Sequence, residues 1–301
     1  MPHLEEQFFC LPDGMRLRYA WFQPTIPSRG TILCLGGRRE FIEKDFEVIE
    51  AWLKRGFKVV ALDLRGQGGS GRMLANKNKS HIGSFDEYRS DINEFYRSIV
   101  KPQLIRPLIV FGHSMGAFVA LEWLLHDKPD VKAAILATPM LALPLPSWLY
   151  GMMRVISCCA LGLGFGNAYT FAERNYSPKQ WHFKNNYLTH DPERLRIIPD
   201  WFARRPEFSL GGVTYSWIDA AVKAITKTRK QLKNIVTPTL VLNAGADRVV
   251  LSREVSKWTR EIPGATEKIY PGALHDLMCE TDDYLSQVWR DIDNFLQGIN
   301  V

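Results

Sequence analysis

Residues 112–116 read Gly-His-Ser-Met-Gly, which places a serine between two glycines with the spacing G-x-S-x-G. The apolar run 107–111 precedes this motif, and the helix-forming run 117–125 follows it, so the serine falls where a strand turns into a helix. Such a turn exposes the serine hydroxyl at the edge of a sheet, and the flanking glycines avoid clashes with the strand and the helix. Ser114 is therefore a candidate nucleophile; in the simpler alternative it only caps the helix.

A serine hydroxyl needs a base that takes its proton and a third group that orients and stabilises that base. After a serine on a strand-to-helix turn, the acid comes next along the chain and the histidine last. The apolar strand 238–243 and a turn of small residues lead to Asp247, and His275 follows the short strand 267–270 and a Pro-Gly turn. We expect Ser114, Asp247 and His275 to form one catalytic triad.

Other acidic residues and histidines fit these positions less well. Asp276 adjoins His275 and is expected to point elsewhere, Asp219 lies in a helical pattern, and Asp282 and Asp283 begin the last helix. His113 is expected to pack beside the serine turn. The remaining histidines follow no strand, and surface or capping roles are expected for His3, His81, His126, His182 and His190.

Acyl transfer also needs two N–H donors directed at the developing oxyanion. One is expected to be the backbone N–H of Met115, the residue after the nucleophile. The other should come from the loop after the strand 31–35, where the backbone N–H of Arg38 is the candidate. Gly36 and Gly37 could instead form a plain flexible turn. The Arg38 side chain is either a ligand for an anionic substrate group or a structural ion-pair former.

Composition agrees with a soluble globular protein of 301 residues, of which 46% are hydrophobic. The polar and acidic N-terminus is unlike a signal peptide, and no apolar run reaches the length of about 18 residues that would predict a membrane span. The five cysteines have neither metal-binding nor disulfide spacing, which indicates a reducing, cytoplasmic compartment. We expect no metal and no organic cofactor.

The net charge is +6, but basic residues are dispersed among acidic ones. The densest basic clusters, 204–205 and 227–230, do not alternate with aromatic residues, so we expect no nucleic-acid binding. They form either a solvated face or a surface that is attracted to an anionic membrane. The glycine-rich loop 65–71 lacks the G-x-G-x-x-G pattern and a P-loop lysine, which argues against a nucleotide site.

Strand and helix patterns alternate along most of the chain. Strands are predicted at 7–11, 15–23, 31–35, 58–64, 107–111, 133–138, 239–243 and 267–270, and helices at 43–55, 84–100, 117–125, 253–262 and 282–299. Ser84 and Glu87 form a capping-box pattern at the start of the second helix. These patterns predict an α/β fold with a mostly parallel eight-stranded sheet and helices on both faces.

The alternation stops between about residues 140 and 230. Residues 141–146 open this insertion without a clear strand, residues 148–165 are apolar and glycine-punctuated, and residues 215–225 have a helical pattern. We expect a core made of residues 1–139 and 231–301, with residues 140–230 as a helical cap over the site. Three roles stay open for residues 148–165: they form an acyl groove, they touch a bilayer, or they only pack on the core.

The chain resembles α/β-hydrolases of the lysophospholipase and monoacylglycerol lipase group, which are serine aminopeptidase-like S33 hydrolases. The resemblance spans nearly the whole chain and is carried by residues 37–44, 63–70, 112–116, 244–247 and 272–275, with 186–194 and 214–217 in the insertion. Many such relatives have His-Gly or Pro-Gly where this chain has Gly36 and Gly37.

The resemblance implies acyl transfer to Ser114, followed by hydrolysis of the acyl-enzyme without a cofactor. The implied substrate is a carboxylic ester with one acyl chain, such as a lysophospholipid or a monoacylglycerol, and peripheral membrane contact through the cap is a further expectation. Two alternatives stay open. In the first, the protein is a small-ester, thioester or amide hydrolase of the same fold; in the second, it is a ligand-binding protein without turnover.

Overall fold

The computed structural model describes residues 3–143 and 147–301. Its centre is one eight-stranded sheet with the order β1-β2-β4-β3-β5-β6-β7-β8. The hairpin of β1 (Gln7–Cys10) and β2 (Arg16–Phe22) is antiparallel to its neighbours. The other strands are mutually parallel: β3 (Gly30–Leu35), β4 (Phe57–Leu62), β5 (Leu108–His113), β6 (Ala133–Ala137), β7 (Thr239–Ala244) and β8 (Thr266–Tyr270). The predicted α/β architecture is confirmed.

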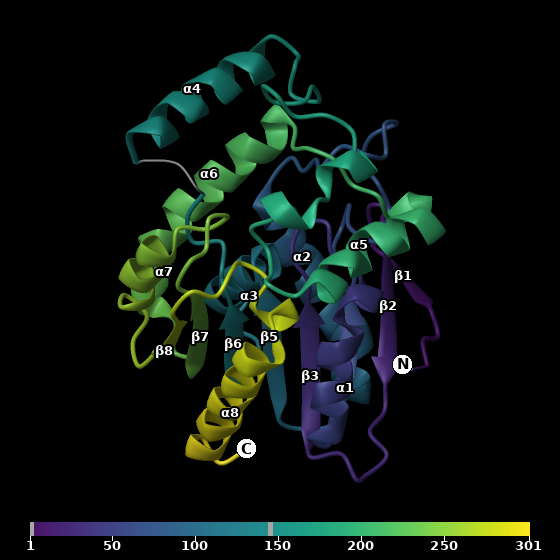
Figure 1. Cartoon of the computed structure of the whole chain (residues 1–301), viewed down its shortest axis with the longest axis vertical. Helices are drawn as coiled ribbons and strands as arrows, with labels where there is room; N and C mark the ends of the chain where they lie inside the picture. Colours follow the sequence, from purple (N-terminus) through teal and green to yellow (C-terminus); the bar gives the residue numbers. More distant parts are fainter. Residues whose placement is uncertain (1–2, 144–146) are drawn as a thin grey trace.

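Helices cover both faces of the sheet, as Figure 1 shows. On one face, α1 (Phe46–Lys54) and α8 (Asp282–Gly298) share a hydrophobic cluster with the strands. On the other face, α2 (Phe85–Phe95), α3 (Met115–His126) and α7 (Ser252–Thr259) pack in a second cluster. The strands β3 to β7 are buried at every position because both of their faces are covered.

Several helix ends differ from the prediction, including the start of α1 and the end of α2. The capping box at Ser84 and Glu87 is present at the start of α2, but the α-helix ends at Phe95 and continues as a π-helical turn over Tyr96–Val100. Before α1, residues Ile42–Asp45 form a 3-10 turn, so the regular helix begins at Phe46. Both differences lie at helix ends, where the hydrophobic period gives the least information.

The described part of the segment between β6 and β7 holds three α-helices, α4 (Ser147–Gly162), α5 (Pro192–Arg204) and α6 (Tyr215–Arg229). Figure 1 shows them above the carboxyl ends of the parallel strands, with α4 outermost. Within the described part of this segment, no strand joins the sheet. Residues 144–146 of the predicted opening lie outside the described residues. The division into a core and a cap at residues 140 and 230 stays a prediction.

Sequence patterns did not predict α5. Its start has a clear signal, because Asp191 accepts hydrogen bonds from the N–H groups of Glu193 and Arg194, at 2.9 and 3.0 Å, and Pro192 follows the cap. Pro199 inside the helix and the polar composition around it obscured the period. The helix is amphipathic and buries Leu195, Ile198 and Phe202, so tertiary packing stabilises it.

All five cysteines are free thiols. None of the helices in residues 3–143 and 147–301 is both long enough and apolar enough to cross a bilayer. The cytoplasmic location stays a prediction.

Candidate active site

Ser114 lies on a strained turn between β5 and α3, with φ 50° and ψ −113°. A non-glycine residue in this region costs on the order of 1–3 kcal/mol and persists where the surroundings hold it. Its N–H donates to the carbonyl of Ala137 at 2.9 Å. A Cβ on Gly116 would lie 2.2 Å from the carbonyl oxygen of Leu35, and a Cβ on Gly112 would lie 2.6 Å from a backbone atom of α3. Both glycines are therefore required for the turn to pack against the sheet.

The structure brings the three predicted triad residues together. His275 Nε2 lies 3.0 Å from Ser114 Oγ, and His275 Nδ1 lies 2.7 Å from Asp247 Oδ2. The other carboxylate oxygen of Asp247 accepts the N–H groups of Val249 and Val250 at 2.7 and 3.0 Å, which fixes its orientation. With Nδ1 donating to Asp247, Nε2 is free to accept the serine proton. The parallel strands β5, β7 and β8 deliver the three residues to one edge of the sheet.

The residues set aside take no place in the described triad contacts, although His113, His182 and Asp276 line the cavity at Ser114. Asp276 turns away from the imidazole of His275 and binds the ammonium of Lys44 at 2.9 Å, and Asp219 pairs with Lys223 within α6. His113 packs beside the serine turn. Other histidines bond to distant groups or face solvent, including His81 on Thr214 and His190 on Glu280.

The two candidate oxyanion donors lie on either side of Ser114. Met115 is the first residue of α3, so the helix leaves its N–H without an intrahelical acceptor. In the described part of the chain, the N–H of Arg38 donates to no other protein group. A Cβ on Gly37 would lie 3.2 Å from Ser114 Cβ, so the Arg38 loop approaches the nucleophile closely. The N–H of Gly37 donates to the Glu40 carboxylate, which anchors this loop, and the oxyanion role of the Arg38 N–H stays a prediction.

Sequence reasoning missed a buried charged cluster beneath the site. Glu40 Oε1 accepts from His113 Nδ1 at 2.8 Å and from Lys44 Nζ at 2.9 Å, and Lys44 also binds Asp276. Burial opposes the charged form of His113, but Glu40 and Asp276 outweigh it and raise the pKa of His113 to about 9. Burial likewise opposes ionisation of Glu40, but His113 and Lys44 lower its pKa. The only signal in the sequence was the i, i+4 spacing of Glu40 and Lys44 beside the loop.

This cluster also resembles a metal site, because Glu40, His113 and Asp276 offer ligand atoms that lie within 4.8 Å of one another. The Lys44 ammonium, however, already binds both carboxylates. An internal cation therefore compensates the negative charge, and the cluster is explained without a metal ion.

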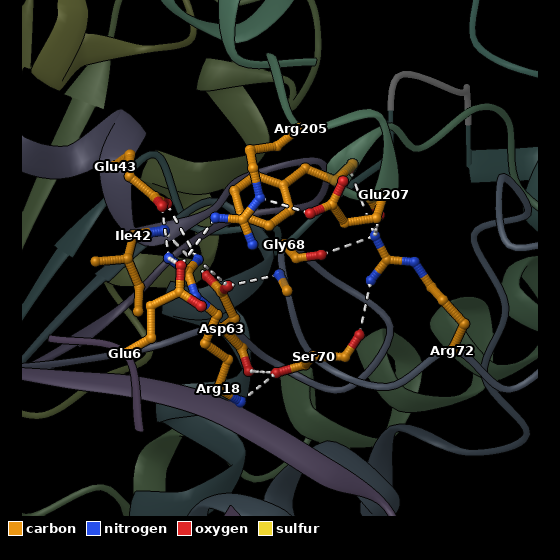
Figure 2. A network of polar contacts seen from close by, with 12 residues as sticks. Glu6, Arg18, Ile42, Glu43, Asp63, Gly68, Ser70, Arg72, Arg205 and Glu207 are labelled. Carbon is orange, nitrogen blue, oxygen red and sulfur yellow. Dashed lines mark hydrogen bonds and ion pairs between the residues drawn. The ribbon is translucent and has the colours of Figure 1, made fainter. Parts of the chain in front are cut away.

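A second buried network holds the far end of the same loop (Figure 2). Arg18 of β2 is fully buried and binds Asp63 at 2.9 Å, together with Glu43. Asp63 accepts the N–H of Ile42 at 3.0 Å and that of Gly69 at 2.7 Å. Burial raises the pKa of Asp63 to about 6, although Arg18 opposes this. The glycine-rich loop thus wraps a protein carboxylate, and it braces the segment that follows Arg38.

A cavity of about 630 Å³ opens on Ser114 and His275. One part of its wall is apolar and includes Met140, Leu143, Leu195, Ile198, Val213, Trp217, Ile218, Val249 and Val250. Charged and polar side chains form another part, with Arg38, Arg39, Glu173, His182 and Asn186. The site therefore offers an apolar and a polar environment to one ligand.

Residues 148–165 were predicted to line a groove, touch a bilayer or pack on the core. Among the side chains that the structure describes, none from this stretch lines the cavity. Six of its apolar side chains are exposed instead: Met152, Val155, Ile156, Leu161, Leu163 and Phe165. The acyl-groove alternative for this stretch is therefore not supported, because other residues form the apolar wall.

This sheet, with a strained serine after β5 and a histidine and acid after later strands, defines an α/β-hydrolase. The model of the serine aminopeptidase S33 family matches residues 26–282, and the chain belongs to this family. The resemblance predicted from the sequence is confirmed.

Relatives of known name cover almost the whole chain. Lysophospholipase L2 of Escherichia coli (strain K12) is 26% identical over 303 residues, which cover 98% of this chain and 88% of that protein. A probable lysophospholipase L2 of Haemophilus influenzae is 26% identical over 300 residues, which cover 98% of this chain and 94% of that protein. A solved structure of a soluble monoglyceride lipase variant from Saccharomyces cerevisiae, in complex with a substrate analog, superposes with a TM-score of 0.74 at 20% sequence identity. The superposition covers 99% of this chain and 97% of that one. That likeness shows the shared fold.

Proposed function

We propose that the protein is a serine hydrolase that cleaves the carboxylic ester of a lipid with a single acyl chain. The observation that carries this proposal is the cavity of about 630 Å³, which Ser114 and His275 line together with the residues of the apolar wall. Its volume is in the range of ligand-binding pockets. The names of the relatives, lysophospholipase and monoglyceride lipase, support an ester substrate of this kind.

In the proposed mechanism, His275 Nε2 takes the proton of Ser114 as Oγ attacks the ester carbonyl. Asp247 holds the imidazole in the right tautomer and stabilises the imidazolium. The backbone N–H groups of Arg38 and Met115 stabilise the oxyanion. His275 then protonates the leaving alcohol, and a water molecule that it activates hydrolyses the acyl-enzyme.

The aliphatic wall supports a preference for long acyl chains. Each methylene that the ester buries against residues such as Leu143, Trp217 and Val250 contributes about 0.8 kcal/mol. The ratio kcat/KM is therefore expected to rise with acyl length until the apolar wall is covered. A flat profile would instead support the small-ester or thioester alternative.

Peripheral membrane contact is part of the proposal. Helix α4 is the outermost element in Figure 1. This helix and the residues after it expose large apolar side chains, among them Val155 at 62%, Leu163 at 73% and Phe165 at 59%. Several exposed large apolar side chains within one short segment are typical of membrane or protein contacts. Attachment to a lipid surface would bring the cavity close to its substrate.

The proposal is tested by covalent labelling with a fluorophosphonate and by a series of esters of increasing acyl length. We expect labelling of the wild type and none of Ser114→Ala, which should also lose about 10⁴-fold or more in kcat with the fold retained. Absence of labelling in the wild type would support the ligand-binding alternative. Wild-type turnover by Ser114→Ala would contradict the proposed nucleophile.

A further inference from the structure

Two guanidinium groups converge on one carbonyl oxygen at the wall of the catalytic cavity. Arg38 Nη1 donates to the carbonyl of Gly211 at 3.1 Å and to Ser80 Oγ at 3.3 Å. Arg39 Nε donates to the same carbonyl at 3.2 Å. Both arginines line the cavity together with Ser114. Two positive charges are thus held side by side near the nucleophile.

These two partly buried charges lack the carboxylate partners that several other arginines of the chain have. Arg18, Arg65 and Arg194 each form ion pairs with carboxylates. Across residues 3–143 and 147–301, neither Arg38 nor Arg39 forms one, so the structural ion-pair role that the sequence left open for Arg38 is not found.

The acidic residues around the cavity do not neutralise the pair. Burial lowers the pKa of Arg38, and the charge of Arg39 lowers it further, while Glu173 opposes the shift. Burial also lowers the pKa of Arg39, again against Glu173. Glu40 and Asp276 border the cavity but are bound to Lys44. Among the described residues that line the cavity, Glu173 is the carboxylate without a cation bound to it, and it opposes only one of the two arginine charges, so the pair favours a bound anion.

The position of the pair relative to the reacting atoms indicates which anion it suits. The arginines directly follow Gly37, which abuts Ser114, and the N–H of Arg39 is fixed by Gln67 Oε1 at 2.8 Å. In a lysophospholipid, only the three-carbon glycerol separates the scissile ester from the phosphate. Guanidinium groups bind phosphate oxygens through paired, charge-assisted hydrogen bonds.

We propose that Arg38 and Arg39 form a subsite for the phosphate of the substrate's head group and so select lysophospholipids over neutral monoacylglycerols. This inference rests on the proposed ester hydrolysis at Ser114. It names the substrate class that the mixed cavity accepts, with the acyl chain on the aliphatic wall and the phosphate on the arginines.

The first test compares kcat/KM for a lysophosphatidylcholine and a monoacylglycerol with the same acyl chain, below the concentrations at which they form micelles. In Arg39→Gln, the ratio of the two values should fall by about 10- to 100-fold. Arg39→Lys keeps the charge but not the planar fork, so it should recover part of the ratio. Arg260→Gln, which removes the same charge from an exposed residue after α7, should leave the ratio unchanged.

A second test measures binding without turnover. In Ser114→Ala, an ether-linked alkyl glycerophosphocholine should raise the Tm more than the matching alkylglycerol, and adding Arg39→Gln should abolish the difference. Inorganic phosphate is a separate arm. If phosphate alone stabilises the protein and the two ether lipids do not differ, the pair binds free phosphate and the head-group assignment is wrong.

The outcomes separate this inference from the proposed function. If the wild type cleaves neither ester, ester hydrolysis of such lipids is itself contradicted. If it cleaves both and Arg39→Gln leaves the ratio unchanged, only the phosphate subsite is overturned.

Discussion

The imidazole of His113 donates from Nδ1 to the carboxylate of Glu40 across 2.8 Å, and this contact joins the two halves of the site. His113 directly precedes the candidate nucleophile. Glu40 also accepts the N–H of Gly37, next to the candidate oxyanion donor Arg38. The serine turn and the oxyanion loop are therefore held in register by one buried ion pair, which makes Glu40 and His113 positioning residues.

Glu40→Gln should lower kcat by about 10- to 100-fold, because the loop that carries the Arg38 N–H loses its charged anchor and shifts. KM for a short ester should change less, since the cavity walls are retained. Steady-state kinetics on a soluble chromogenic ester measure both values. The exposed Glu261 provides the control variant Glu261→Gln. An equal loss of kcat in both variants would contradict the positioning role.

The stability of the protein should fall as the pH rises from about 6.5 to about 9. The pKa of His113 is raised to about 9 in the folded protein by Glu40 and Asp276, against burial and the charge of Lys44. A raised pKa means that the folded state binds more protons than the unfolded state within this window, so its stabilising contribution is complete below pH 6.5 and is lost towards pH 9.

Urea unfolding of the wild type and His113→Gln at a series of pH values measures this effect. The wild type should lose on the order of 1–3 kcal/mol more of its free energy of unfolding than the variant over the window. Parallel pH profiles for the two proteins would show that the His113 charge does not stabilise the fold.

Asp247→Asn should reduce kcat heavily, by about 10⁴-fold, while substrate binding is mostly retained, because the imidazole of His275 loses its orienting anion. Asp276→Asn removes the carboxylate next to His275 in the sequence, which binds the ammonium of Lys44 rather than the imidazole of His275. It should cost much less in kcat. Greater damage from Asp276→Asn, with both variants folded, would mean that the triad acid is misassigned.

Leu163→Asp should weaken binding to lipid vesicles without destabilising the protein, because this side chain is 73% exposed. A charge there opposes insertion of the apolar surface after α4 into a bilayer. Co-sedimentation with anionic vesicles measures binding, and hydrolysis of a short soluble ester serves as the internal control. Unchanged vesicle binding at an unchanged melting temperature would rule out this surface as the membrane contact.

Much of the fold and of the candidate triad could be predicted from the chain by itself. The strand, the glycines and the helix around Ser114 are consecutive, so their spacing determines a serine on a sharp turn. The order of Asp247 and His275 after later strands is also local information, because parallel strands end at one edge of the sheet. Their meeting within hydrogen-bond distance follows from that topology, and their catalytic roles stay predictions.

Only the tertiary structure decided which charges meet. The contact of Glu40 with His113 spans 73 residues, and those of Arg38 and Arg39 with Gly211 span 173 and 172, so no local spacing could reveal them. It also showed that α5, whose interior proline hides its period, helps to form the apolar wall of the cavity, whereas α4 exposes its apolar side chains. Hydrophobic periodicity predicts that a residue is apolar and on one face. Whether that face meets a cavity, a core or solvent depends on the packing of elements that are distant in sequence.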